Sequence, residues 1–383
     1  MPKTLGLYLH IPFCVQKCRY CDFCSTPAGE SVRAAYVDAL CAHLRAAAPQ
    51  AKACRVDTVY LGGGTPTLLS PADFFRILDT VRAHYDLMTD AEVTTECNPV
   101  THTDGLFDGL ARAGINRLSI GLQSTHEREL QHLGRLHDFT AFRDTFTAAR
   151  HAGLSNISAD VMFGIPGQTT ESFRETLQAL CDLSPEHISA YGLRIEEGTP
   201  FWRVRDTLPL PDEDTETEMA ELVSTLLPTR GYARYEISNY ARPGRESRHN
   251  LRYWLGADYL GFGPAAHSFF DGVRFATPPD TEGYIKAVRE GRYDALITER
   301  HTVEGPEARD EYVMLRMRLS TGVEKADFKH RFGLSFEEAY GDISRLIDGG
   351  FLQNDATRVA FSARGMWLSN AILSEWLDFG GDV

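Results

Sequence analysis

Short runs of apolar and β-branched residues alternate with longer amphipathic segments over the first half of the chain. Six of the short runs predict strands, and the segments between them carry apolar residues at three- and four-residue spacing, which predicts helices. This alternation is typical of βαβ units and a parallel sheet. The expected strands are Leu5–His10, Asp57–Leu61, Glu92–Glu96, Arg117–Gly121, Ile157–Phe163 and His187–Leu193, and the clearest helices are Ser31–Ala47, Pro71–Tyr85, Phe139–Ala152 and Thr170–Leu183.

Clusters of glycine, proline and polar residues follow all six expected strands. In a barrel of parallel strands the carboxyl ends share one face, where active sites are built. Six strands rather than eight predict an α/β fold with an open, partial (β/α)6 barrel. Its open side would admit something large or be closed by a later part of the chain.

The second half of the chain predicts two further parts. Residues 206–302 are expected to connect and to pack on a barrel formed by residues 1–205, and Gly305-Pro306 marks a linker near the start of a domain at 303–383. In that domain three helices precede a hairpin and a last helix, which predicts a winged-helix-like α+β fold. The expected elements are Ala308–Leu319, Lys325–Phe332, Ser335–Ile347, the hairpin Phe351–Phe361 and Ser362–Trp376.

The amino-acid composition argues against some classes of partner and favours one cellular compartment. The formal net charge is −14, which argues against a general affinity for nucleic acid or anionic lipid, and carboxylates outnumber cations in residues 303–383 as well. A lid or packing role is therefore expected for that domain. No apolar stretch approaches the roughly 20 residues that span a bilayer, so only peripheral membrane contact is expected. The start of the sequence has no signal peptide, which favours the reducing cytoplasm.

Three cysteines stand at C-x3-C-x2-C spacing in the loop after the first strand: Cys14, Cys18 and Cys21. A four-iron cluster held by three thiolates keeps one iron open to an exchangeable ligand, as catalytic zinc sites do. Three other interpretations compete with this one. The cysteines could be buried structural thiols, a zinc site completed by His10, or a disulfide pair with one thiol left over.

The loop His10-Ile-Pro-Phe-Cys14-Val-Gln-Lys-Cys18-Arg-Tyr-Cys21-Asp-Phe23 resembles the signature of the radical S-adenosylmethionine (SAM) enzymes. The resemblance implies a radical SAM barrel in which SAM binds the fourth iron of a 4Fe-4S cluster through its amino and carboxylate groups. It also implies that Tyr20 and Tyr8 lie against the cofactor. Cys24 lies three residues after the last ligand, whereas related coproporphyrinogen oxidases carry an extra cysteine two residues after it, so Cys24 is interpreted as a bystander.

Further motifs follow the later strands. Gly62-Gly63-Gly64-Thr65-Pro66 is similar to the radical SAM glycine segment that meets the amino end of SAM, although a tight turn would also need these glycines. Glu96 could accept hydrogen bonds from the ribose hydroxyls, or be a surface carboxylate. The polar ring is completed by Gln123, Arg135 and Asp160, for each of which a structural hydrogen bond is the alternative.

Together these motifs match, in order and position, the family of oxygen-independent coproporphyrinogen III oxidases and their relatives, and the resemblance covers essentially the whole chain. In that family the matching positions bind SAM. The predicted SAM site therefore comprises Tyr8, Tyr20, Gly63, Gly64, Thr65, Glu96, Gln123, Arg135 and Asp160.

The family implies two functions in porphyrin metabolism. One is oxidative decarboxylation of coproporphyrinogen III, started by a deoxyadenosyl radical. The other is that of a heme chaperone, which binds heme and hands it to acceptor proteins, with respiratory proteins as the expected acceptors. Only 13 residues precede Cys14, the extra cysteine is displaced, and Arg248–Trp254 carries the H-N-x-x-Y-W pattern of the heme chaperones. All three features favour the chaperone, and the decarboxylase remains the alternative.

His249 is the candidate heme ligand, because a neutral imidazole is a good axial ligand and nearby Tyr and Trp rings can pack on a macrocycle. Arg248 or Arg252 could meet a propionate. The alternative is an aromatic cluster that packs the later segment onto the barrel. His267 is the second choice, and another radical SAM reaction on a large substrate is a third possible function.

Overall fold

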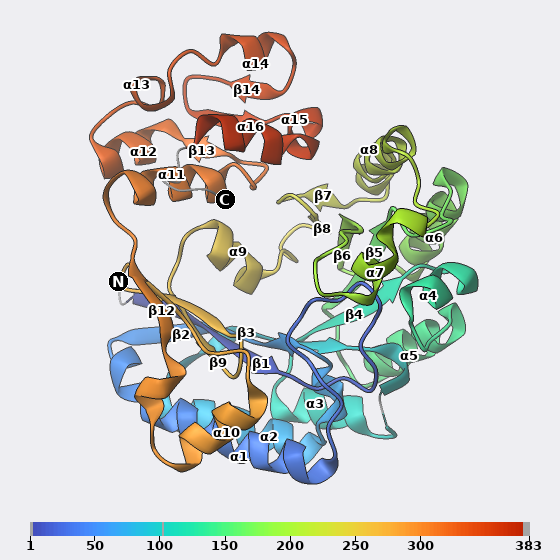
Figure 1. Cartoon of the computed structure of the whole chain (residues 1–383), viewed down its shortest axis with the longest axis vertical. Helices are drawn as coiled ribbons and strands as arrows, with labels where there is room; N and C mark the ends of the chain where they lie inside the picture. Colours follow the sequence, from blue (N-terminus) through green and yellow to red (C-terminus); the bar gives the residue numbers. More distant parts are fainter. Residues whose placement is uncertain (1–2, 102, 378–383) are drawn as a thin grey trace.

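The computed structural model describes residues 3–101 and 103–377, and a twelve-stranded sheet runs through most of it (Figure 1). Its six central strands are parallel and stand in sequence order, which confirms the predicted partial barrel. These strands are β1 (Lys3–Ile11), β2 (Cys54–Gly63), β3 (Asp86–Cys97), β4 (Arg117–Gln123), β5 (Ile157–Phe163) and β6 (His187–Gly192).

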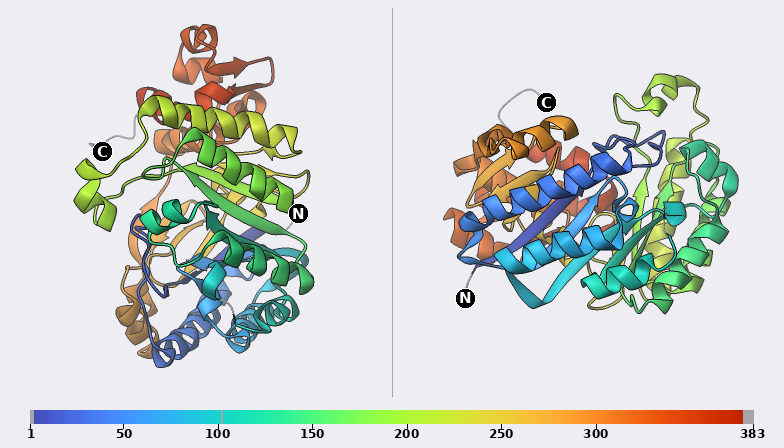
Figure 2. Two further views of the ribbon diagram at one scale, coloured as in Figure 1. Left: turned by 90° about the vertical axis from the view of Figure 1, so that its right-hand side faces the viewer. Right: turned by 90° about the horizontal axis from the view of Figure 1, so that it is seen from below.

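Helices cover the outer face of these strands (Figure 2). Along β1 the residues Leu5, Leu7 and Leu9 are buried in the main apolar core with the helices, whereas Tyr8 and His10 alternate with them and point to the inner face. The helices are α1 (Glu30–Ala47), α2 (Pro71–His84), α3 (Leu106–Ala113), α4 (Glu127–Leu133), α5 (Phe139–His151) and α6 (Thr170–Leu183).

The segment predicted to connect the domains extends the same sheet at both edges. Beyond β6 it adds β8 (Asn239–Ala241) and β7 (Ala233–Arg234), and beside β1 it adds four strands in the order β9, β10, β11 and β12. Strands of two to five residues are too short to show a clear alternation, so the sequence pattern did not predict them. These four are β9 (Tyr259–Phe262), β10 (His267–Phe270), β11 (Val273–Ala276) and β12 (Thr298–Thr302).

Four helices also belong to this segment and its approach. One of them, α9 (Arg248–Trp254), carries the H-N-x-x-Y-W motif and contacts β2 on one side and the C-terminal domain on the other (Figure 1). The others are α7 (Pro200–Val204), α8 (Glu213–Thr229) and α10 (Thr281–Arg289).

The C-terminal domain has its own apolar core and a three-stranded sheet in the order β13, β15, β14. The expected helix Ser335–Ile347 is two short helices, because Gly341 has a φ of +72° and ends the first one. The expected last helix is interrupted at Leu368, and residues 378–383 of the predicted domain lie outside the described residues. The elements are α11 (Gly305–Arg316), β13 (Val323–Glu324), α12 (Lys325–Phe332), α13 (Phe336–Tyr340), α14 (Ser344–Asp348), β14 (Leu352–Asn354), β15 (Arg358–Phe361), α15 (Ala363–Trp367) and α16 (Ser369–Trp376).

This domain packs against the β6 edge of the barrel. The Trp367 ring meets the Phe163 ring edge-on at 5.9 Å, and the backbone N–H of Ser320 donates to the Tyr235 carbonyl at 3.0 Å. No helix in the described part of the chain is long and apolar enough to cross a membrane.

Candidate cofactor site

The three cysteines of the loop after β1 line one cavity of about 500 Å³. Backbone hydrogen bonds hold this loop, because the N–H of Cys14 donates to Thr26 O at 3.3 Å and that of Cys21 to Cys18 O at 3.3 Å. All three thiols are half-buried and free of disulfides. The cavity lies at the carboxyl ends of the parallel strands, where the barrel was predicted to carry its site.

The alternatives for these cysteines find no support in the geometry. Both His10 ring nitrogens are engaged, Nδ1 with the Tyr8 hydroxyl at 3.0 Å and Nε2 with the Cys24 carbonyl at 2.8 Å, so His10 does not complete a zinc site. Among the described residues no group of three His, Cys, Asp or Glu side chains converges on a single ion. Thiolates that hold a four-iron cluster bind separate irons and need not converge on one point. Cys24 does not line the cavity.

The glycine segment after β2 lies directly against the cysteine loop. The N–H groups of Gly64 and Thr65 donate to the carbonyls of Ile11 at 2.9 Å and Phe13 at 2.6 Å. A β-carbon on Gly64 would stand 2.5 Å from the Phe13 oxygen, and Gly63 has a φ of +107° that favours glycine. Gly63 and Gly64 therefore line the cavity, and Thr65 lies behind them with its hydroxyl 3.5 Å from the Cys14 sulfur.

Glu96 lines the cavity beside the glycines. Its carboxylate accepts hydrogen bonds from the Tyr60 hydroxyl at 2.8 Å and from the Gly63 N–H at 3.0 Å. Burial raises the pKa of Glu96 to about 7, against the lowering effect of the Tyr60 hydrogen bond. A buried carboxyl group with this pKa suits hydrogen bonding with hydroxyl groups. Sequence reasoning missed Tyr60, although strand alternation places it on the same face as Gly62.

Three polar side chains from β4, the loop after α4, and β5 complete the lining. Arg135 donates to the Tyr20 hydroxyl at 2.9 Å and to Asn98. Gln123 has a φ of +68°, a strained conformation that is common at functional sites, and it accepts from Tyr191 at 3.1 Å. The supporting residues that sequence reasoning missed are Asn98, Tyr191 and Ser119, whose hydroxyl donates to Asp160 at 3.2 Å.

The cavity thus gathers most of the predicted cluster and SAM residues, and their roles toward SAM stay predictions. Tyr8 lies outside the lining, one layer deeper, with its ring centre 6.1 Å from that of Tyr60. The predicted residues that do line the cavity are Cys14, Cys18, Tyr20, Cys21, Gly63, Gly64, Glu96, Gln123, Arg135 and Asp160.

His249 lies in the interior of the barrel with 0% of its surface exposed. Its Nδ1 is 2.9 Å from the Thr58 hydroxyl, its Nε2 is 2.9 Å from the Tyr253 hydroxyl, and its ring stacks on Tyr60 at 5.2 Å. Burial lowers the pKa of His249 to about 3, so the imidazole is neutral. Iron binding at His249 would require one of these hydrogen bonds to break. This arrangement is the aromatic cluster that stood as the alternative to a heme ligand.

The rest of the motif helix is also anchored to the barrel. Arg252 is buried and donates to the Asp57 carboxylate at 3.0 Å and to the Asp258 carbonyl at 2.8 Å, so it is not free to meet a propionate. Glu92 accepts from the backbone N–H groups of Arg248 at 3.1 Å and His249 at 3.0 Å at the start of α9. The Arg248 side chain is 42% exposed.

The chain matches two known family profiles. Residues 8–180 match the Radical SAM superfamily, and residues 303–368 match the HemN C-terminal domain. In fold it is similar to the coproporphyrinogen III oxidase HemN from Escherichia coli, with a TM-score of 0.86 and 23% identity over 99% of this chain and 91% of that one. The superfamily implies SAM and a 4Fe-4S cluster, and the three thiols on one cavity fit such a cluster.

Curated relatives resemble the chain over its full length. The heme chaperone HemW of Escherichia coli is 36% identical over 97% of this chain and 98% of its own, and that of Lactococcus lactis is 32% identical over 98% of both. The heme chaperone HemW of Mycobacterium tuberculosis is 35% identical over 97% of this chain and 94% of its own. By this full-length similarity the chain belongs to the family of radical SAM proteins named heme chaperone HemW.

Proposed function

We propose that this protein is a heme chaperone, which binds heme and transfers it to acceptor proteins while it carries a SAM-liganded 4Fe-4S cluster. The observation that carries the proposal is the full-length similarity to relatives named heme chaperone HemW. The H-N-x-x-Y-W segment at 249–254 supports it independently. The proposed setting is the cytoplasm with peripheral membrane contact, no nucleic acid, and respiratory proteins as acceptors.

In this proposal Cys14, Cys18 and Cys21 hold the cluster, whose open iron supplies a binding place for SAM. The chain's own residues orient the cofactor from the cavity wall. Glu96 accepts from the ribose hydroxyls, and the glycine backbone lets the amino end of SAM approach closely. The remaining proposed SAM contacts are Tyr8, Tyr20, Thr65, Gln123, Arg135 and Asp160.

His249 remains the proposed heme ligand, on the condition that one of its hydrogen bonds breaks. Its Nε2 binds iron only after the Tyr253 hydroxyl leaves, whereas Thr58 can stay on Nδ1 and orient the ring, as outer hydrogen bonds do at metal sites. Because burial keeps the imidazole neutral, no proton has to be lost first. The step therefore needs the Tyr253 side chain to move away from the imidazole, and it does not need a change of pH.

The test is heme titration of the anaerobically reconstituted protein, followed by absorption. We expect one tightly bound heme per chain, and we expect His249→Ala to weaken binding about tenfold or more, as loss of a direct metal ligand should. His301→Ala is the control, because His301 is an exposed histidine of the same segment and not a candidate ligand. Since His249→Ala also removes buried hydrogen bonds, His249→Met is measured too, because its thioether would change the heme spectrum if this position ligates iron.

Coproporphyrinogen III decarboxylation is assayed with the same preparation. Robust decarboxylation without tight heme binding would overturn the chaperone proposal in favour of the enzyme. An unchanged heme spectrum in His249→Met would remove His249 as the ligand and leave heme binding intact.

A further inference from the structure

A cavity of about 330 Å³ lies where the motif helix meets the C-terminal domain. Trp254 and Leu255 at the end of α9 form one side, and residues of α11 and α12 form the other. Trp254 is the last residue of the H-N-x-x-Y-W motif, and the packing around His249 does not account for it. Figure 1 shows α9 between the barrel and this domain.

Four aromatic side chains line this cavity. Trp254 comes from α9, Phe269 from β10, and Tyr312 and Phe332 from the C-terminal domain. The Tyr312 and Phe332 rings meet edge-on at 5.5 Å. All four rings are half-buried, so they present flat apolar area that a ring system could cover.

Among the described residues, the charged groups of the cavity leave one cation without an ion pair. Glu311 binds Arg274 through two contacts of 2.7 and 2.8 Å. Asp327 accepts from Arg331 at 2.8 Å and from Tyr312 at 2.7 Å. The cation without an ion pair among the described residues is Arg316.

Arg316 has only weak contacts in the described part of the protein. Its Nη2 is 3.4 Å from the Leu255 carbonyl, and its guanidinium lies over the Tyr312 ring at 5.2 Å. Its Nε is buried and has no hydrogen-bond partner among the described residues. A buried guanidinium N–H without an acceptor is costly, and a bound carboxylate would remove that cost.

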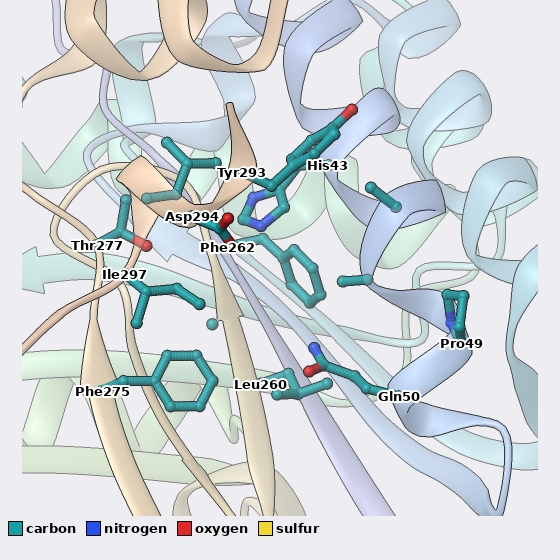
Figure 3. Close-up of a pocket in the computed structure, with 14 residues that line it drawn as sticks. His43, Pro49, Gln50, Leu260, Phe262, Phe275, Thr277, Tyr293, Asp294 and Ile297 are labelled. Atoms are coloured by element: carbon teal, nitrogen blue, oxygen red, sulfur yellow. The ribbon is translucent and has the colours of Figure 1, made fainter. Parts of the chain in front are cut away.

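A second apolar cavity gives a useful contrast. It holds about 310 Å³ between α1, strands β9 and β11, and residues 293–297, with His43, Phe262 and Tyr293 among its lining residues (Figure 3). None of its described lining residues is Lys or Arg, and Asp294 stands on its wall. It therefore offers rings without a partner for an anionic ligand.

We propose that the cavity of Trp254 and Arg316 binds the carboxylate-bearing edge of a tetrapyrrole. Arg316 meets a propionate, and the aromatic side chains pack on the adjoining ring. A cavity of about 330 Å³ takes one edge of the macrocycle rather than the whole. The inference rests on the proposed heme-binding function, but not on His249 as the iron ligand. In this proposal, residues of the C-terminal domain contact the bound tetrapyrrole directly.

The test compares three probes on the intact, reconstituted protein: heme, iron-free protoporphyrin IX and the dimethyl ester of that porphyrin. Arg316→Gln should weaken heme and protoporphyrin IX about tenfold or more, because charge-assisted hydrogen bonds are lost. Its affinity for the diester should equal that of wild type. Porphyrin quenching of tryptophan fluorescence should fall in Trp254→Phe.

Arg345→Gln is the matched control, because Arg345 belongs to the same domain and does not line the cavity. Equal affinity of wild type and Arg316→Gln for heme and protoporphyrin IX would overturn this inference and leave the heme chaperone proposal standing. An equal loss for the acid and the diester would also overturn it, since the effect would then not come from the carboxylate. Failure of wild type to bind heme at all would instead overturn the proposed function.

Discussion

The buried ion pair between Arg252 and Asp57 should decide how firmly the motif helix is held on the barrel. The Arg252 side chain is 5% exposed and that of Asp57 is 19% exposed. Arg252→Met would leave the largely buried Asp57 carboxylate with only the exposed Arg248 guanidinium, at 4.0 Å, as an ion-pair partner. It would also remove the donor to the Asp258 carbonyl. Breaking such a pair costs about 3 to 5 kcal/mol, and the partial exposure of Asp57 favours the lower end, about 3 kcal/mol.

Hydrogen exchange of the peptide that covers 248–256 measures this loss directly, because it reports local opening in a protein of two domains. A cost of about 3 kcal/mol should make the α9 amides exchange about 100-fold faster in Arg252→Met. Asp57→Leu should do the same, whereas the double variant should exchange much more slowly than two additive losses imply. Strictly additive effects, or an unchanged exchange rate, would refute the reasoning.

Two further changes test other parts of the fold. Gly64→Ala should push the cysteine loop from the glycine segment at a cost of about 1 to 3 kcal/mol, measured as less iron and sulfide after reconstitution. Gly29→Ala has open space, and its iron and sulfide content should match wild type. Burial raises the pKa of Glu236 from 4.5 to about 7, so the folded state holds a proton that the unfolded chain releases, and stability should fall as pH rises through this window. In Glu236→Gln the unfolding temperature should not show this fall as pH rises. Parallel profiles of unfolding temperature against pH for the two proteins would contradict the prediction.

The sequence predicted the parallel strands and the common face of the cofactor loops. Short apolar runs between amphipathic segments, and the glycine and proline clusters after them, are local signals. It did not predict Tyr60, Asn98 or Ser119, whose hydrogen bonds support Glu96, Arg135 and Asp160, because these partners are far apart in the sequence and meet only in the folded chain. Nor could it predict the edge strands, whose pairing depends on long-range contacts rather than on residue pattern.

The motif helix α9 is a second case in which the sequence pattern does not predict tertiary contacts. Within seven residues of α9, periodicity does not say which side chains face the barrel. His249 and Arg252 turn inward and become structural partners of Thr58 and Asp57, whereas Trp254 faces the C-terminal domain. A motif match therefore marks a segment without showing which of its residues a ligand can reach.

The inward residues also connect the motif to the cofactor cavity. His249 stacks on Tyr60, and the Tyr60 hydroxyl donates to Glu96, so one continuous set of contacts runs from α9 to the cavity wall. Heme bound through His249 would disturb this stack, because the Tyr253 hydroxyl must leave a ring that also packs on Tyr60, and it would thereby change the support of Glu96. A tetrapyrrole edge held by Trp254 and Arg316 leaves the stack in place. The two ways of binding heme consequently differ in whether heme changes the affinity of the cavity for SAM.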